Sequence, residues 1–214
     1  MYNLPQHKEK NEAVVNDFIA RYPFAFVSGC DAQGKPVATQ IPVFIEEQNG
    51  RKILRGHIMK HTDHHRAFEH NQHVLVIFTG HNTYVSGSWY SNPYTPSTWN
   101  YMSVHVQGII RFLDDAALID ALRKITLHFE NGNTASTTIY DNLPTDYTQR
   151  LMQAIVAFEI EIKEINTVFK LSQDRDEKSY ERIIKELMQQ GESGQVIAAE
   201  MQKRQQAVFT KSTT

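Results

Sequence analysis

The order of the predicted strands constrains this chain most. Seven short segments have the residue types and lengths of strands, at 24–28, 37–44, 52–58, 74–78, 83–86, 101–112 and 157–165. In the first half of the chain these segments follow one another through short turns, without regular helical crossovers. Parallel neighbours need a connection of about a dozen residues or more, so strands joined by short turns must pair antiparallel. The sequence therefore predicts an α+β fold, an antiparallel sheet or small barrel with helices packed outside it.

Local signals mark several element boundaries. Asn49-Gly50 is a strong hairpin signal, and Pro42 inside a predicted strand indicates a sheet edge or a bulge. Thr62 is placed to cap a short helix that follows it. Asp176 opens an amphipathic helix, and Gly191 is predicted to close it. Further helices are predicted over residues 11–21, from Asp114 or Asp115 through Glu130, and over residues 147–155.

Length and composition favour one principal domain. A chain of 214 residues, 41% hydrophobic and 21% charged, can bury a core as a soluble globular protein does. We place this domain at residues 1–190 and expect residues 191–214 to form a helical or frayed tail. The chain contains no internal repeat and no low-complexity segment that would argue for another organisation.

Net charge, cysteine content and the length of the apolar runs limit which partners and which cellular compartment we expect. The net charge of −2 gives no general attraction to nucleic acid, so DNA binding needs a local patch. The single cysteine, Cys30, excludes an internal disulfide and argues for a reducing compartment. The N-terminus has no apolar core of the signal-peptide type, and the longest apolar runs, such as Val74–Phe78, are too short to cross a bilayer. We therefore expect a cytoplasmic protein without a membrane partner.

The segment from Gly80 to Gly108 concentrates large aromatic residues. It holds both tryptophans, Trp89 and Trp99, and four of the nine tyrosines, Tyr84, Tyr90, Tyr94 and Tyr101, interleaved with Ser, Asn, Pro and Gly. Rings with one polar handle suit a half-buried surface that faces a partner. We interpret the segment as a loop between two strands that lines a binding cleft or a subunit interface. The alternative is a long hairpin loop that aromatic anchors pin to its own core.

Seven of the ten histidines fall between His57 and His81. A metal site would draw on His57, His61, His64 or His65, together with Asp63. No HExxH or paired CxxC spacing is present, so we predict no metal. An anion site fits better, because cations and a hydroxyl gather where a strand ends and a helix begins. These residues are Arg55, His57, Lys60, His61, Thr62, His64 and Arg66. The alternative is a solvated basic face.

Other candidate chemistry has less support. The GxGxxG and GxxxxGK[ST] phosphate-binding loops are absent. Ser86, Ser88 and His105 are near one another in sequence, but VSGSWY lacks the GxSxG elbow and no third partner is indicated. The segment FKLSQDR gathers polar side chains between a strand and a helix, where they can reach a ligand or a neighbouring subunit. The alternative is helix capping by Ser172 or Asp174.

Nine segments carry a family resemblance. They are MYNLPQH, PFAFVSG, VATQIPVF, LRGHIMKHT, VLVIFTG, TYVSGSWY, STWNYMSVHVQG, AIVAFEIEI and KLSQDR, and they span residues 1 to about 185 in one order. As a set they resemble the PaiB family of FMN-binding split-barrel proteins, named for a protease-synthase and sporulation negative regulator. This chain departs from the family at Gly87, where a proline is usual, and at Asp174, where an asparagine is usual. Asp174 places a negative charge next to Arg175, which weakens an anion-binding role for that arginine.

The resemblance implies a six-stranded antiparallel split β-barrel, dimeric, with FMN bound between the subunits. Pyridoxamine phosphate oxidases, flavin reductases and haem-utilisation proteins share this fold. The resemblance implies that Lys60 and Thr62 hold the FMN phosphate, supported by His57 and Arg66. The full set of expected cofactor-binding residues is Ala38, Thr39, Gln40 and Ile41 along the isoalloxazine; His57, Ile58, Lys60, Thr62 and Arg66 at the phosphate; Trp89, Trp99 and Tyr101 from the opposite subunit; and Lys170, Gln173 and Arg175 in KLSQDR.

Three functions are compatible with this resemblance. The first is a flavin-dependent redox or flavin-sensing role, as an FMN-dependent oxidoreductase whose substrate and catalytic residues the sequence does not indicate. The second is a dimeric negative transcriptional regulator, although no helix-turn-helix is evident and Lys and Arg are not gathered on one recognisable helix. The third is haem binding or utilisation, with His105 or His64 as the histidine involved.

Overall fold

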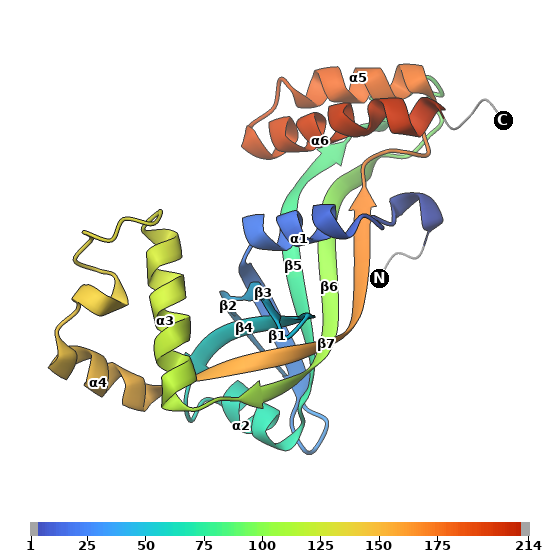
Figure 1. Ribbon diagram of the computed structural model, residues 1–214. Coiled ribbons are helices and arrows are strands. Elements are labelled where there is room, and N and C mark those ends of the chain that lie inside the picture. Colours follow the sequence, from blue (N-terminus) through green and yellow to red (C-terminus); the bar gives the residue numbers. More distant parts are fainter. Residues whose placement is uncertain (1–3, 211–214) are drawn as a thin grey trace. The chain divides into compact units, whose positions relative to one another are not determined.

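The computed structural model describes residues 4–210, so the start of MYNLPQH and the last four residues of the tail lie outside it. One antiparallel sheet and its flanking helices confirm the α+β class (Figure 1). The strands are β1 (Phe24–Cys30), β2 (Pro36–Pro42), β3 (Phe44–Gln48), β4 (Arg51–Met59), β5 (His73–Val85), β6 (Thr98–Phe112) and β7 (Ile155–Lys170). The helices are η1 (Pro5–His7), α1 (Glu12–Arg21), α2 (Asp63–His70), η2 (Gly87–Trp89), α3 (Asp115–Phe129), η3 (Tyr140–Asn142), α4 (Thr145–Ala154), α5 (Glu177–Leu187) and α6 (Glu192–Phe209).

The chain divides into two compact units, which are described separately. Unit 1 comprises Met1–Phe18, Thr79–Val104 and Asn166–Thr214. Unit 2 comprises Ile19–Phe78 and His105–Ile165. The strands β5, β6 and β7 contribute residues to both units, whereas β1 to β4 belong to unit 2 alone. The division of the domain at residue 190 stays a prediction.

The connection between β2 and β3 determines the shape of the sheet in unit 2. These strands lie at the two ends of the strand order β2-β1-β5-β6-β7-β4-β3, yet one residue, Val43, joins them. Because a single residue spans only about 3.8 Å between neighbouring Cα atoms, the sheet must curl until its edges meet. The Val43 N–H donates to the Pro23 carbonyl at 2.8 Å, and its side chain is fully buried. The predicted split barrel is confirmed in this curled sheet.

Several strand boundaries differ from the sequence prediction, and the sheet has seven strands where the family resemblance implied six. The predicted strand 37–44 is broken at Val43 into β2 and β3, and Pro42 ends an edge strand as its position indicated. The predicted strands 74–78 and 83–86 are parts of the single strand β5. The strand runs through residues 79–82 without a turn, and the alternation of buried positions changes phase there, with Val74, Val76 and Phe78 buried before it and Thr83 and Val85 after it.

Two predicted turns form as their residue types require. Asn49 and Gly50 adopt φ values of 52° and 72°, and Gln48 pairs with Arg51, which gives a two-residue hairpin between β3 and β4. After β4, His61 has φ 65° and Thr62 caps α2, accepting the His65 N–H at 3.3 Å. The chain therefore reverses sharply between the end of β4 and the first turn of α2.

A network of charges attaches α3 to the sheet of unit 2. Arg55, whose side chain is 11% exposed, lies 3.3 Å from Glu159, 3.5 Å from Glu46 and 3.7 Å from Asp120. Lys124 of α3 contacts Glu46 at 3.1 Å and Asp120 at 2.8 Å. Removing one partner of such a partly buried network leaves unpaired charges, which is costly. Arg55 is thus held in a structural role.

The helices α5 and α6 lie side by side within unit 1 (Figure 1). Asp176 caps α5 as predicted, accepting the Ser179 N–H at 2.9 Å. Gly191 does not close that helix, because α5 ends at Leu187 and Gly191, with φ −65°, is the N-cap of α6. The buried Tyr180 hydroxyl donates to the Met201 carbonyl at 2.9 Å, and burial raises the pKa of this phenol to about 12.

Substitution of Gly56 tests the seam of the barrel. A Cβ at this position would lie 2.9 Å from the Pro42 carbonyl oxygen and 2.8 Å from Cζ of Phe158. We expect Gly56→Ala to lower the free energy of unfolding by about 1–3 kcal/mol, because the extra atom overpacks a closed contact. Urea unfolding measures the change, with Gly191→Ser as the control because that site has no heavy atom within 4 Å of an added Cβ. Equal stability of Gly56→Ala and the wild type would contradict close contact at the seam.

Candidate functional site

Two segments expected to bind FMN adjoin in unit 2. The edge strand β2 contacts both β4 and α2. Ala38 and Gln40 are exposed on one face of β2, whereas Thr39 and Ile41 are half-buried on the other. Because β2 ends the strand order, its outer edge has no strand partner among residues 4–210. Backbone N–H and C=O groups of this edge are therefore available to a planar polar ligand.

The turn between β4 and α2 presents hydroxyl and backbone groups. The Thr62 hydroxyl donates to the Met59 carbonyl at 3.1 Å, and the Lys60 N–H donates to the Ala154 carbonyl at 2.8 Å. His61 holds the left-handed conformation that makes the reversal. The N–H groups of His64 and His65 are already bonded, to Asp63 and to Thr62, so the start of α2 contributes mainly its positive helix-dipole end, which favours an anion.

Two cations of this turn have no ion-pair partner within the described part of the chain. They are half-buried Lys60 and exposed Arg66. Arg55 differs from them, because three carboxylates surround it. His64 is also engaged, with Nε2 at 3.0 Å from the Thr62 hydroxyl and Nδ1 at 3.1 Å from Asp63. The free donors of the turn are therefore Lys60 and Arg66.

A buried nitrogen on β4 lacks a partner. Nδ1 of His57 is buried without a hydrogen bond among the described residues, and burial lowers the pKa of the ring. Its neighbour Ile58 points to the opposite face, where its side chain is 3% exposed in the core, so only its backbone is left for a ligand. An unpaired buried polar atom is costly in a folded protein. His57 together with Lys60, Thr62 and Arg66 forms a donor set that fits a phosphate ester beside a polar ring.

The aromatic segment of unit 1 combines the two predicted interpretations. Tyr90 is 6% exposed and pins the loop to its own unit, as the hairpin alternative requires. Trp99 and Tyr84 are 53% and 48% exposed and meet edge to face at 6.1 Å, whereas Tyr94 is 93% exposed. Trp89 and Tyr101 are half-buried. The segment thus has aromatic anchors and also offers exposed rings for contact.

Gly87 closes this loop in a way that a proline would not allow. Its N–H donates to the Ser97 hydroxyl at 2.9 Å, and a Cβ would lie 2.3 Å from the Thr95 carbonyl oxygen. The departure from the family's usual proline therefore corresponds to a loop closed through the glycine backbone.

The segment FKLSQDR forms an ordered turn in unit 1 whose polar groups are largely bonded. The Lys170 ammonium donates to the Trp99 carbonyl at 3.0 Å and to the Thr98 hydroxyl, and burial lowers its pKa. The Gln173 amide oxygen accepts the Leu171 N–H at 2.7 Å. Neither Ser172 nor Asp174 caps α5, so that alternative is wrong, since Asp176 takes the position. Lys170 and Gln173 hold the turn closed.

Sequence reasoning missed two partners of this turn. The Arg175 guanidinium lies 4.6 Å from the centre of the Tyr90 ring and 3.4 Å from Asp174, which agrees with the expected neutralising effect of that aspartate. Nδ1 of His7, a buried histidine, lies 3.2 Å from Oε1 of Gln173. His7 and Gln173 are 166 positions apart, and no local spacing signal connects them.

Residues 4–210 contain neither a metal-binding cluster nor a membrane-spanning helix. No group of three or more His, Cys, Asp or Glu side chains is arranged to hold a metal ion there. Nor does any helix in that range have the length and apolar character needed to cross a bilayer.

The curled antiparallel sheet with outer helices defines an α+β split-barrel protein. Solved structures with this fold include the FAD and heme binding protein from Mycobacterium smegmatis, with a TM-score of 0.59 and 20% identity over 77% of this chain and 73% of that one. The flavocytochrome Anf3 from Azotobacter vinelandii has a TM-score of 0.57 and 16% identity over 79% of this chain and 72% of that one. At these identities the likeness concerns the fold alone.

Sequence comparison shows the family. The family model described as "Putative FMN-binding domain" matches residues 1–164, and the chain belongs to that family. Protease synthase and sporulation protein PAI 2 of Bacillus subtilis is 31% identical over 187 residues, which cover 87% of this chain and 89% of that protein. The resemblance to PaiB is therefore confirmed.

Gly87→Pro tests the loop closure. We expect this variant to lose about 2–4 kcal/mol of stability, because proline removes the hydrogen bond to Ser97 and overlaps the Thr95 carbonyl. Ser97→Ala, which removes the hydrogen bond alone, is expected to cost about 1 kcal/mol. Thermal unfolding monitored by tryptophan fluorescence measures both. A Gly87→Pro variant as stable as the wild type would show that the loop does not close this way.

Proposed function

We propose that unit 2 binds FMN, with the phosphate at the β4–α2 turn and the isoalloxazine along β2. Lys60 and Arg66 supply unpaired positive charge. The Thr62 hydroxyl, which donates to the Met59 carbonyl and accepts from the His65 N–H, fixes the shape of the turn that would hold the phosphate. The proposal rests on the contact between α2, the helix that follows this turn, and the edge strand β2, whose outer edge has no strand partner among residues 4–210.

His57 is the residue of this set that faces the ring system in the proposal. Burial lowers the pKa of His57 from 6.5, so the neutral imidazole predominates at pH 7. Its Nδ1 has no partner among the described residues and is available for one hydrogen bond with a ligand. FMN, when bound, supplies one- and two-electron transfer. In this proposal the residues of β2 and of the β4–α2 turn bind and orient it. A flavin-dependent redox or flavin-sensing role follows.

In the proposed dimer, the candidate residues of unit 1 contact the flavin that a partner subunit holds. Trp99 is exposed and Trp89 and Tyr101 are half-buried, so their rings are available to a flavin held by another chain. Arg175 is partly neutralised by Asp174, and Lys170 and Gln173 are used within the turn. We therefore assign these three to shaping the surface near the aromatic rings, not to the phosphate.

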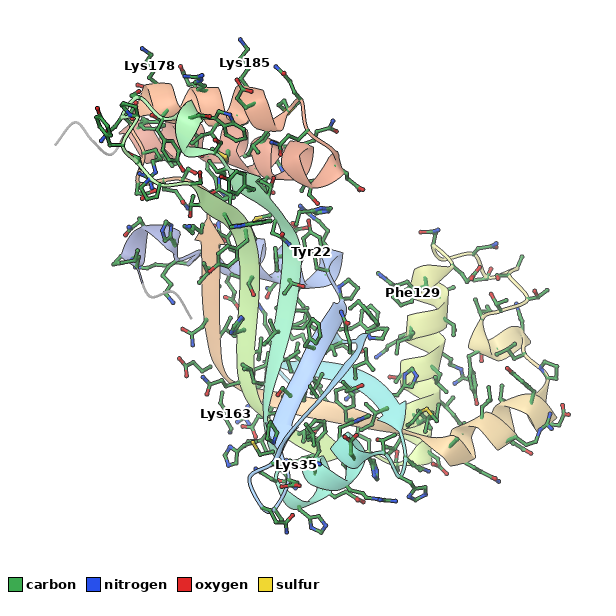
Figure 2. All side chains as sticks on the ribbon, turned by 180° about the vertical axis from the view of Figure 1, so that it is seen from behind. Tyr22, Lys35, Phe129, Lys163, Lys178 and Lys185 are labelled. Carbon is green, nitrogen blue, oxygen red and sulfur yellow. The ribbon has the colours of Figure 1, made fainter. Side chains whose placement is uncertain are left out.

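The difference between FMN and riboflavin tests the phosphate site. Riboflavin lacks the phosphate, so Lys60→Gln should weaken FMN binding about 10- to 100-fold, as expected for the loss of a charge-assisted contact, and leave riboflavin binding unchanged. Quenching of flavin fluorescence on titration measures both affinities. The control is Lys35→Gln, which removes an exposed lysine of the β1–β2 turn that Figure 2 shows in unit 2.

Two results would overturn the proposal. One is no FMN binding by the wild-type protein at tens of micromolar ligand. The other is an equal loss of FMN and riboflavin affinity in Lys60→Gln, because a phosphate contact cannot act on a ligand without a phosphate.

We also propose that the protein is a homodimer that pairs through the outer face of β1 and β5. Phe24 and Phe26 of β1 are 55% and 41% exposed, and Ile77, the β5 partner of Phe26, is half-buried on the same face. Next to them lies a groove of about 650 Å³ whose lining includes Leu75 and Ile109. Soluble proteins rarely leave an apolar face of this kind open.

The strand from Ala157 to Ile165 contributes little apolar surface to such an interface. Ala157, Phe158 and Ile160 are fully buried within unit 2, and Ile165 is 38% exposed. The exposed apolar residues of unit 2 that support association therefore lie mainly on β1.

Phe26→Asp tests the dimer. A charge at the centre of an interface of about 800 Å² per partner should dissociate it at micromolar concentration. Light scattering should then fall from about twice the chain mass to 24.7 kDa. Phe129→Asp is the matched control, because Phe129 is 52% exposed on α3 (Figure 2) and lies outside the proposed face. A wild-type protein of 24.7 kDa would contradict the proposal.

A further inference from the structure

The outer face of α5 carries a stripe of cations. Lys178, Arg182 and Lys185 occupy positions i, i+4 and i+7 of the helix, and all three are exposed. None of the three has an ion pair or hydrogen bond through its side chain to another residue in the range 4–210. Figure 2 shows Lys178 and Lys185 projecting from the same side of α5, away from α6. The structure thus places three exposed basic residues along one face of α5.

Two of the three acidic residues of α5 are directed toward α6. The Glu181 carboxylate accepts a hydrogen bond from the Gln205 amide of α6 at 3.3 Å. Glu177 lines a groove with Gln202, Gln205 and Gln206 of α6. The third, Glu186, is half-buried and follows Arg182 by one helical turn. The basic stripe, defined as Lys178, Arg182 and Lys185, therefore presents three exposed cations beside one carboxylate.

The apolar side of α5 is already buried within unit 1. This favours a nucleic acid over a membrane surface as the anionic partner of the stripe. Tyr180, Ile183 and Leu187 are fully buried and Ile184 is 7% exposed, all within unit 1. A helix that lies in a membrane surface needs an apolar face for the acyl boundary. This helix presents only charged groups outward, so its chemistry suits a hydrated phosphate backbone and not a lipid surface.

We propose that the basic stripe of α5 binds the phosphate backbone of double-stranded nucleic acid without reading base sequence. Seven residues of α-helix rise about 10 Å, which is comparable with about three phosphate-to-phosphate steps of one strand at about 3.4 Å of duplex axis each. The Asp176 cap and the buried contacts hold α5 rigid, so the three cations are presented together. The site is separate from the residues assigned to FMN.

The test compares two triple variants. Anisotropy of a fluorescein-labelled 24-base-pair DNA duplex measures affinity at 50 and 200 mM NaCl. Three phosphate contacts predict a loss of roughly 40-fold between these salt concentrations. Lys178→Gln/Arg182→Gln/Lys185→Gln should abolish binding and its salt dependence. The control Lys10→Gln/Lys35→Gln/Arg150→Gln removes the same charge from exposed cations elsewhere and should retain most of the affinity.

The unfolding temperature and FMN binding serve as controls for correct folding of both variants. All six substituted side chains are exposed, so both variants should unfold at the wild-type temperature and bind FMN as the wild type does. The proposal is overturned if the wild type does not bind the duplex at 50 mM NaCl. It is also overturned if both triple variants lose binding equally, or if the stripe binds phosphatidylserine vesicles and not DNA.

Discussion

A sheet whose two edge strands are joined by one residue cannot lie flat, and this constraint organises unit 2. Val43 forces β2 and β3 together from opposite ends of the strand order. The closure brings the open edge of β2 against β4 and α2, where the free donors of the turn lie. The absence of a side chain at Gly56 allows this approach, because the Pro42 carbonyl occupies the space that a Cβ would need. The proposed flavin site is therefore a consequence of how the barrel closes.

Ion pairs distinguish the cations that hold the fold together from those that are available to a ligand. Arg55 stands in the same motif as Lys60 and Arg66, but three carboxylates hold it and it attaches α3 to the sheet. Lys60 and Arg66 have no such partners among the described residues, so their charges are available to an anion. In unit 1, Arg175 stacks on Tyr90 beside Asp174 and belongs with the structural group.

The sequence predicted features that depend on neighbouring residues and missed those that depend on distant ones. Asn49-Gly50 and the caps at Thr62 and Asp176 form as predicted, because turn and cap geometry is set by a few adjacent residues. The break at Val43 and the contacts His7–Gln173 and Tyr90–Arg175 depend on tertiary packing, which no local pattern encodes. For the same reason the sequence located the β4–α2 turn but did not distinguish Arg55 from its free neighbours.

Hydrogen–deuterium exchange with and without FMN tests the central claim most directly. The account predicts slower exchange on adding FMN in two segments of unit 2, the strand β2 and the turn from Met59 through Arg66, because the ligand covers the open backbone of the first and the phosphate binds at the second. Slower exchange in only one of the two, or in neither at saturating FMN, would contradict a flavin site built where the barrel closes.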